Sequence, residues 1–280
     1  MKSHFLLYLK LIRFDRPIGW ILLAWPCLWG IAIAYQITHT SLLLCIQWSI
    51  ILTVGAFLMR SFGCIINDLV DCKIDEKVTR TKDRPLASGA MTQRQSLFAG
   101  FLTLIPAALI FLQLPSAAKV YATIGAVLLF IYPFMKRITY YPQFVLGLAF
   151  NIGVPVAYVC VTRVSAVTVP HCSVVYLYLC GVFWTMAYDT LYAFQDVADD
   201  QITGVKSTAI KFNHYPKVFV SFCYLLAGFF LLLSKEQIDL GAILFTGFAT
   251  YTLWHWNPVD VESCGKLFRL HAIFGLFGIV

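Results

Sequence analysis

Long apolar runs constrain the fold of this chain more than any other feature. About 20 consecutive apolar residues can cross the hydrocarbon core of a bilayer as a helix, and runs of this kind recur along nearly the whole sequence. Only 12% of the 280 residues are charged, whereas a soluble domain carries roughly a quarter. The sequence therefore predicts an all-α integral membrane protein.

Nine transmembrane helices are predicted from the apolar runs, which are bounded by charged or turn residues. Their approximate ranges are 18–36, 42–66, 95–113, 118–135, 141–162, 173–195, 216–233, 239–256 and 268–280. The last range is short, so either its helix ends at the membrane face or the carboxyl end is missing. Residues 1–280 are expected to form a single polytopic domain, because these spans use the whole length.

Lysine and arginine are distributed unevenly over the predicted connections. If the amino terminus faces the cytoplasm, all but three of the 21 basic residues lie on that side, and the exceptions are Lys119, Arg163 and Lys235. Cytoplasmic loops retain basic residues, so this bias predicts a multi-pass protein with its amino terminus in the cytoplasm. We expect the membrane to be a bacterial inner membrane, with the active site toward the cytoplasm. The net charge of +7 then faces anionic lipid headgroups, and no nucleic-acid partner is expected.

Acidic residues gather in two short segments, near the inner ends of the second and sixth predicted helices. Residues three, four and seven positions apart share one face of a helix, so each segment is predicted to form an acidic stripe. The first stripe contains Asn67, Asp68, Asp71 and Asp75, and the second contains Asp189, Tyr192, Asp196 and Asp200.

Stacked carboxylates at a membrane boundary repel one another unless cations neutralise them. Hard oxygen ligands suit Mg²⁺, which binds through one or two carboxylates together with phosphate oxygens. We therefore predict two Mg²⁺-binding motifs that face each other and hold a diphosphate. The alternative is that both clusters are solvated turns at the interface. The predicted metal ligands are Asn67, Asp68, Asp71, Asp75, Asp196, Asp199 and Asp200.

Basic residues accompany both acidic stripes. Any one of them could be only an anchor at the inner membrane face, but beside the stripes they are predicted to stabilise a departing diphosphate. These residues are Arg60, which lies seven positions before Asn67, then Arg80, Lys82 and Arg84 after the first stripe, and Lys206 after the second.

Two further segments combine charge with helix-end signals. Tyr132 and Lys136 share a face if the helix continues past Pro133; the alternative is an interfacial tyrosine with snorkelling basic side chains. The segment 13–19, Arg-Phe-Asp-Arg-Pro-Ile-Gly, precedes the first span and places proline in the first helical turn. Anchoring and catalytic roles are both open for this segment.

Together these motifs resemble the intramembrane aromatic prenyltransferases, over residues 13–275. The matching segments are Asn67-Asp-x-x-Asp-x-x-x-Asp75, Arg84-Pro-Leu-Ala-Ser-Gly89, Tyr132-x-x-x-Lys136, Asp189-Thr-x-Tyr-Ala-x-x-Asp196-x-x-Asp199-Asp200 and Gly204-x-Lys206-Ser-Thr208. The segment 132–143 is similar to the branch of that family that uses 4-hydroxybenzoate. His271 stands where the resemblance leads us to expect asparagine.

The resemblance implies nine helices around a central cavity that opens sideways to lipid, with Mg²⁺ on both aspartate motifs. It also implies an activity, the transfer of a polyprenyl group from polyprenyl diphosphate to the carbon ortho to the phenol of 4-hydroxybenzoate, in ubiquinone biosynthesis. Tyr132 and Lys136 would lie near the diphosphate. We further predict that Arg137 pairs with the acceptor carboxylate and that Asp189 orients the phenol or takes its proton. The predicted catalytic carboxylates are those of Asp68, Asp71, Asp75, Asp189, Asp196 and Asp200.

Three alternatives are kept beside this interpretation. The same chemistry could serve another acceptor, such as homogentisate, a naphthoate or a lipid alcohol. A membrane transporter also carries charges within its spans, but its charges should lie near the middle of the membrane rather than at helix ends. A purely structural membrane subunit gives no reason for the paired acidic stripes.

Overall fold

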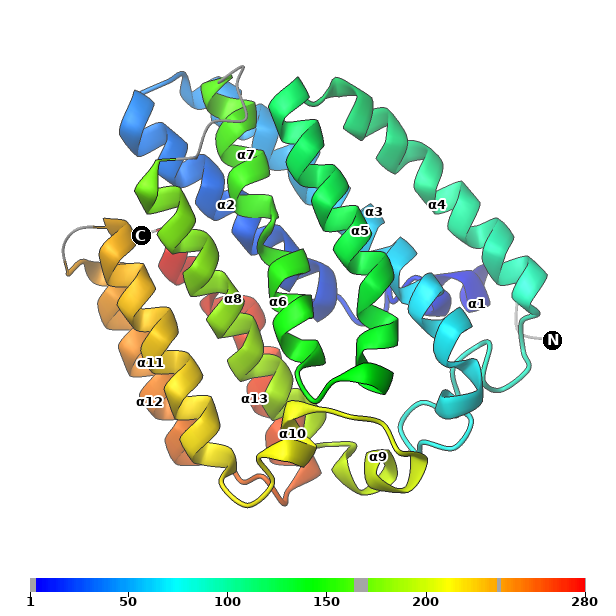
Figure 1. Ribbon diagram of the computed structural model, residues 1–280. Helices are drawn as coiled ribbons and strands as arrows, with labels where there is room; N and C mark the ends of the chain where they lie inside the picture. Colours follow the sequence, from blue (N-terminus) through cyan, green and yellow to red (C-terminus); the bar gives the residue numbers. More distant parts are fainter. Residues whose placement is uncertain (1–3, 164–170, 236–237, 280) are drawn as a thin grey trace.

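The computed structural model describes residues 4–163, 171–235 and 238–279, and all regular structure in these ranges is helical. Figure 1 shows the long helices side by side in one bundle. The helices are α1 (His4–Leu11), α2 (Ile18–Thr38), α3 (Leu42–Asp75), α4 (Gln93–Gln113), α5 (Ser116–Ile138), α6 (Pro142–Asn151), α7 (Gly153–Thr162), α8 (Cys172–Ala193), α9 (Val197–Thr203), α10 (Thr208–Lys211), α11 (Pro216–Lys235), α12 (Leu240–His255) and α13 (Val261–Phe274), followed by the 3-10 turn η1 (Gly275–Gly278).

Within the described ranges, seven helical segments are long and apolar enough to cross a membrane, with α6 and α7 counted as one. The all-α membrane class is therefore confirmed. Each of the nine predicted ranges overlaps a helix, but α12 and α13, with 16 and 14 residues, are shorter than the others. The predicted range 268–280 is wrong, because α13 begins at Val261 and ends at Phe274, six residues before the chain ends.

The main hydrophobic core lies between α2, α7, α8 and α11. Its centre holds large rings, with the indoles of Trp29 and Trp184 5.3 Å apart and the ring of Phe277 5.0 Å from Trp29. By contrast, α4 leaves apolar side chains such as Leu97, Phe98 and Leu112 more than half exposed. An apolar surface of this kind on a multi-pass bundle faces lipid.

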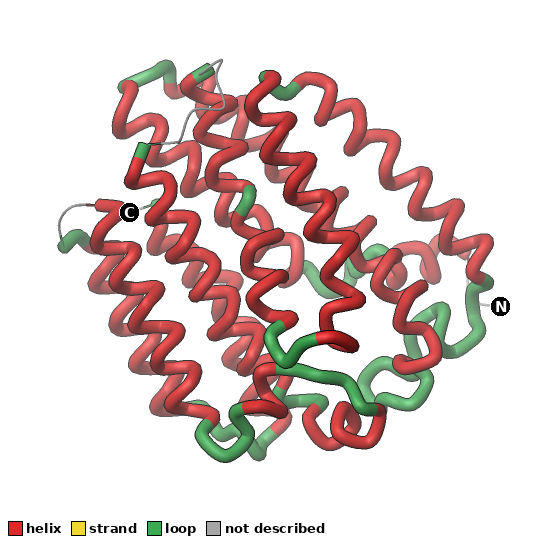
Figure 2. Tube along the Cα trace, viewed as in Figure 1, coloured by secondary structure: helices red, strands yellow, loops and turns green. Residues whose placement is uncertain are grey.

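One end of the bundle collects the polar segments of the chain. α3, α5 and α8 all end there, and α9 and α10 lie beside them in Figure 1. Figure 2 shows the connecting loops at the same end, including the long connection between α3 and α4. α3 continues nine residues beyond its predicted end at 66, so the whole first acidic stripe lies on a regular helix.

His271, which departs from the expected asparagine, is a buried link between helices. Its side chain is fully buried, its Nε2 lies 2.7 Å from the hydroxyl of Tyr224 on α11, and its Nδ1 lies 2.9 Å from the carbonyl oxygen of Leu267. The imidazole therefore joins α13 to α11, and we read its role as structural.

His271→Ala is expected to lower the free energy of unfolding by about 2–4 kcal/mol, because it removes two buried hydrogen bonds and leaves the Tyr224 hydroxyl without this partner. Denaturation of the detergent-solubilised protein checks this value. The control is His255→Ala at the exposed end of α12, where a loss below about 0.5 kcal/mol is expected. Equal losses for the two variants would contradict the structural role.

Candidate active site

The first acidic motif lies on the last two turns of α3, as its spacing predicts. Asp68, Asp71 and Asp75 are only 2%, 0% and 6% exposed. Buried carboxylates are costly unless they are paired, so their partners decide what the motif can do. Those partners come from three other parts of the chain.

Asp68 and Asp75 are held by two arginines. Arg13, from the connection between α1 and α2, donates through Nη2 to both oxygens of Asp68 at 2.7 Å. Arg84, from the connection between α3 and α4, donates through Nη1 to Asp68 Oδ1 at 3.1 Å and to Asp75 Oδ2 at 2.7 Å. A single guanidinium therefore bridges the two carboxylates.

Asp71 is held by the end of α5. Lys136 Nζ donates to Asp71 Oδ2 at 2.5 Å, and Arg137 Nη2 donates to the carbonyl oxygen of Val70 at 2.9 Å and lies 3.5 Å from Asp71 Oδ1. α5 continues through Pro133 to Ile138, which confirms the helix that places Tyr132 and Lys136 on one face. The carboxyl end of α5 therefore supplies the basic partners of Asp71.

The second acidic motif does not lie on one helix, and the prediction of a single stripe from Asp189 to Asp200 is wrong. α8 ends at Ala193, the chain turns through residues 194–196, and α9 begins at Val197. The ring of Phe194 is buried and packs edge-on against Trp256 at 5.3 Å, where the chain leaves α8. Asp189, Asp196 and Asp200 are therefore spaced as on one helix although a turn separates the first from the others, and the spacing alone gives no sign of this turn.

The connection between α3 and α4 links the two motifs. Arg80 pairs with Asp196 through two guanidinium nitrogens and donates through Nη1 to the Tyr192 hydroxyl at 2.7 Å. The backbone amide of Thr79 donates to Asp199 Oδ2 at 2.8 Å. The segment that follows the first motif thus lies against the second, as expected if the two motifs serve one site.

Among the described residues, no three histidine, cysteine or acidic side chains converge closely enough to form a metal cage by themselves. Arginine and lysine neutralise the carboxylates instead, although a divalent cation was the simplest neutraliser expected from the sequence. The donor set nevertheless suits Mg²⁺, which needs only one or two carboxylates when phosphate oxygens complete its shell. Burial and, secondarily, the neighbouring Asp196 raise the pKa of Asp200 to about 7, so a nearby cation would favour its ionised form.

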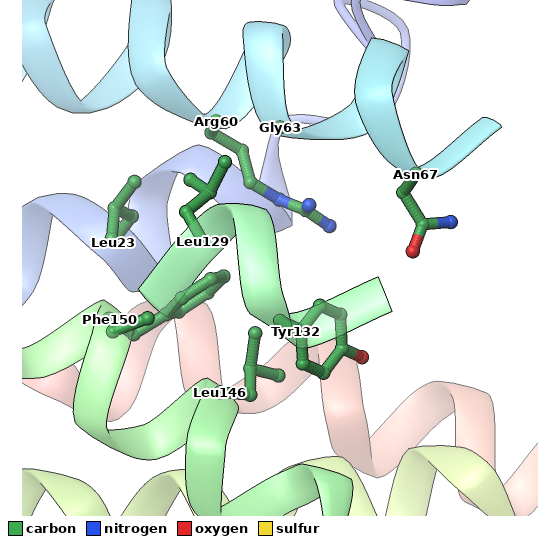
Figure 3. Close-up of a pocket in the computed structure, with 9 residues that line it drawn as sticks. Leu23, Arg60, Gly63, Asn67, Leu129, Tyr132, Leu146 and Phe150 are labelled. Atoms are coloured by element: carbon green, nitrogen blue, oxygen red, sulfur yellow. The ribbon is translucent and has the colours of Figure 1, made fainter. Parts of the chain in front are cut away.

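A small cavity of about 40 Å³ lies beside the first motif, between α2, α3, α5 and α6. In Figure 3 the polar groups of Arg60, Asn67 and Tyr132 lie toward one side of it and the apolar side chains toward the other. A volume of this size admits water but not a substituted benzene ring. The apolar side is formed by Leu23, Leu129, Leu146, Ala149 and Phe150.

Among the described residues that line this cavity, Arg60 is the one cation. Its Nε is buried and has no hydrogen-bond partner among the described residues, and its guanidinium carbon lies 5.7 Å from the centre of the Phe150 ring. A Cβ added at Gly19 would approach Arg60 Nε to 2.6 Å, so glycine at this position of α2 leaves room for the guanidinium. Arg60 thus lines the cavity and has a buried donor without a partner among the described residues.

The other predicted basic residues are placed differently. Lys82 is exposed in the connection between α3 and α4. Lys206 Nζ donates to the carbonyl oxygen of Ile138 at 3.2 Å, so it caps the carboxyl end of α5. The sequence left both an anchoring and a catalytic role open for the segment that contains Arg13. In the structure Arg13 pairs with Asp68. The sequence signal for this residue was its position four residues before Pro17, at the start of a helix.

The fold and the site define an all-α membrane protein with two acidic motifs brought together at one end of its bundle. The chain belongs to the UbiA prenyltransferase family, whose model matches residues 23–275. It is 40% identical over 277 residues to the mitochondrial 4-hydroxybenzoate polyprenyltransferase of Dictyostelium discoideum, covering 96% of this chain and 58% of that protein. It therefore spans less than two thirds of that relative.

A bacterial relative and a solved structure match over more of their lengths. The 4-hydroxybenzoate octaprenyltransferase of Aliivibrio fischeri is 37% identical over 267 residues, which cover 92% of this chain and 89% of that one. A UbiA homolog from Archaeoglobus fulgidus, solved bound to GPP and Mg²⁺, has a TM-score of 0.68 at 15% identity, covering 98% and 99% of the two chains. This last likeness concerns the fold.

Proposed function

We propose that this chain transfers a polyprenyl group from polyprenyl diphosphate to the ring carbon ortho to the phenol of 4-hydroxybenzoate, in a Mg²⁺-dependent step of ubiquinone biosynthesis. The observation that carries the proposal is that the connection following the first acidic motif lies against the second one, through Arg80 and the Thr79 amide. Lys136 holds the first motif, and the cavity beside it is lined by Arg60, whose Nε has no partner among the described residues. Both relatives above are named for this acceptor, and the homolog from Archaeoglobus fulgidus binds a prenyl diphosphate with Mg²⁺.

The metal would be held by oxygen atoms of the two motifs. The candidate ligands are Asn67, Asp71, Asp75, Asp196, Asp199 and Asp200. When bound, Mg²⁺ neutralises diphosphate charge and so makes the diphosphate a better leaving group. Hard carboxylate and amide oxygens of this kind are the ligands that Mg²⁺ prefers.

The basic side chains that now neutralise the aspartates are suited to the departing diphosphate. Lys136, Arg80 and Arg84 each approach a carboxylate of one motif, and each could donate to a phosphate oxygen brought between the motifs. Charge-assisted hydrogen bonds of this type stabilise negative charge as it develops on the leaving group. Tyr132, which lines the cavity, can add a neutral donor.

We place the acceptor carboxylate at Arg60 rather than at Arg137, where the sequence suggested it. The Nε of Arg60 is buried and has no partner among the described residues, whereas the Arg137 side chain is 46% exposed and already donates to Val70. Asp189 on α8 is close enough to interact electrostatically with Arg60, so it is suited to orient the phenol or accept its proton. The acceptor can enter only when the cavity widens.

Attack by the ring carbon requires that water be kept from the allylic carbon, because water would capture the prenyl group as an alcohol. The apolar side of the cavity, formed by Leu129, Leu146 and Phe150 among others, offers water no hydrogen-bond partner, so a bound prenyl chain and acceptor would displace it there. Aromatic faces such as that of Phe150 also stabilise positive charge. The exposed apolar surface of α4 fits direct contact with membrane lipid.

We also propose that the protein is a single polytopic domain of a bacterial inner membrane, with its site toward the cytoplasm. The distribution of basic residues supports this orientation. Relatives occur in mitochondria as well as in bacteria, and we expect no nucleic-acid partner.

The proposal is tested with purified protein, Mg²⁺ and geranyl diphosphate, offered with 4-hydroxybenzoate, homogentisate, a hydroxynaphthoate and a long-chain alcohol in separate reactions. Mass spectrometry should find a C-prenylated product with 4-hydroxybenzoate at the highest rate, and none when a chelator is present. Faster turnover of another acceptor would change the substrate but keep the chemistry. No prenylated product from any acceptor would overturn the proposal.

A further inference from the structure

The amino-terminal helix α1 forms a small hydrophobic cluster apart from the main core. Leu7, Leu11 and Ile12 pack there with Ile65 of α3 and with residues of the connection to α4 and of α4 itself. The carbonyl oxygen of Ile12 also accepts a hydrogen bond from the buried Ser61 hydroxyl at 3.3 Å. The start of the α1–α2 connection is therefore fixed against α3, the helix that carries the first acidic motif.

Arg13 follows this fixed point in an unusual backbone conformation. Its φ is +58°, in the left-handed region that non-glycine residues seldom adopt and that the surrounding contacts must maintain. The turn is closed by hydrogen bonds from Arg13 N to Lys10 O at 3.2 Å and from Arg16 N to Arg13 O at 3.0 Å. This conformation accompanies a side chain that is directed inward and only 17% exposed.

Asp68 is almost fully buried, and both of its carboxylate oxygens accept hydrogen bonds. Arg13 binds the two oxygens at 2.7 Å and Arg84 binds one of them at 3.1 Å. Arg84 also binds Asp75 at 2.7 Å. If Arg13 were absent, Arg84 would be the only cation left on Asp68 among the described residues, and its contact with Asp75 would weaken.

We propose that Arg13 is a positioning residue for the diphosphate site, and that Asp68 is its buried structural counter-ion rather than a metal ligand. Arg13 satisfies Asp68, which leaves Arg84 placed against Asp75 and available to a phosphate oxygen. The packing of α1 in its hydrophobic cluster and the left-handed turn at Arg13 together hold the Arg13 guanidinium against Asp68. The inference rests on the proposed prenyl transfer and assigns two residues within that site.

A double-mutant cycle tests the assignment, with Arg13→Gln, Asp68→Asn and the combination of both in the full-length chain. Three quantities are measured: the KM for geranyl diphosphate, the Mg²⁺ concentration at half-maximal rate, and the melting temperature without metal. Arg16→Gln is the matched control, because Arg16 lies in the same connection but is 65% exposed. Asp71→Asn is the comparison for a true metal ligand.

Arg13→Gln should raise the KM for geranyl diphosphate by about tenfold, and the double variant should recover most of that loss because the buried anion is then removed. Asp68→Asn should leave the half-maximal Mg²⁺ concentration within about twofold, whereas Asp71→Asn should raise it by about tenfold or more. The Arg16→Gln control should match the unaltered chain.

Either of two activity results would overturn the inference, and so would one stability result. If Asp68→Asn raises the Mg²⁺ requirement as much as Asp71→Asn does, Asp68 is a ligand; if Arg13→Gln behaves like Arg16→Gln, Arg13 is only a membrane anchor. The melting temperatures separate this inference from the proposed function, because they need no turnover. Even for a protein without prenyl transfer activity, each single variant should melt lower, and the double variant should lose less than the sum; additive losses would refute the Arg13–Asp68 pair.

Discussion

Asp71→Asn and Asp196→Asn are each expected to lower kcat/KM for prenyl transfer by about 10²- to 10³-fold, because each removes a charged oxygen that would hold metal or diphosphate when the leaving group takes up charge. Asp71 lies on α3 and Asp196 in the turn before α9, and they have different basic partners, Lys136 and Arg80. Their effects are nevertheless expected to overlap, since groups that act as one unit are not additive. The double variant should be little worse than either single one.

Steady-state rates with geranyl diphosphate and 4-hydroxybenzoate, over a range of Mg²⁺ concentrations, measure this effect. Asp15→Asn is the matched control, because its carboxylate is 48% exposed and lies 4.0 Å from Arg16. It should retain nearly full activity. A double variant whose loss equals the product of the single losses would show that the two motifs act independently.

The second large effect concerns acceptor recognition. Arg60→Lys is expected to lower kcat/KM for 4-hydroxybenzoate by about ten- to a hundredfold, because a hydrogen bond to a charged group contributes about 1.5–3 kcal/mol and an ammonium cannot reproduce the planar fork of a guanidinium. The loss should be much smaller for 4-methylphenol, which has no carboxylate, if that phenol reacts. The KM for geranyl diphosphate should change little.

Arg137→Lys is the comparison variant, since Arg137 was the residue suggested by sequence for the same carboxylate. It should change the use of 4-hydroxybenzoate by less than about threefold, because its side chain is nearly half exposed and a lysine preserves the charge at the inner face. A selective loss with 4-hydroxybenzoate in Arg137→Lys, and not in Arg60→Lys, would return the acceptor site to Arg137. Equal losses on both phenols in Arg60→Lys would instead place Arg60 on the diphosphate.

The features predicted well from sequence are those set by local periodicity. Apolar run length gives the membrane helices, and the spacing of Asp68, Asp71 and Asp75 gives a stripe that the unbroken α3 confirms. The prediction that Tyr132 and Lys136 share one helix face required only that α5 continue past Pro133, and it does. The same reasoning fails at Asp196, because the packing of Phe194 against Trp256 ends α8, and that contact joins residues 62 positions apart.

The partners of the acidic residues could not be predicted, because they depend on contacts between distant segments. Arg80 and Asp196 are separated by 116 positions, and Arg13 and Asp68 by 55. The sequence also does not indicate which arginine has a buried nitrogen without a hydrogen-bond partner. Arg60 and Arg137 both look like residues of the inner membrane face, and only the cavity beside Phe150 distinguishes them.

The central claim is that the two aspartate motifs form one Mg²⁺-dependent diphosphate site. Isothermal titration of the purified protein with geranyl thiodiphosphate, which resists ionisation, tests this claim without requiring turnover. We predict saturable binding in the presence of Mg²⁺, at least about tenfold weaker binding with a chelator, and a similar weakening in both Asp71→Asn and Asp196→Asn. Equally tight binding with and without the chelator, or weakening in only one of the two variants, would contradict the claim.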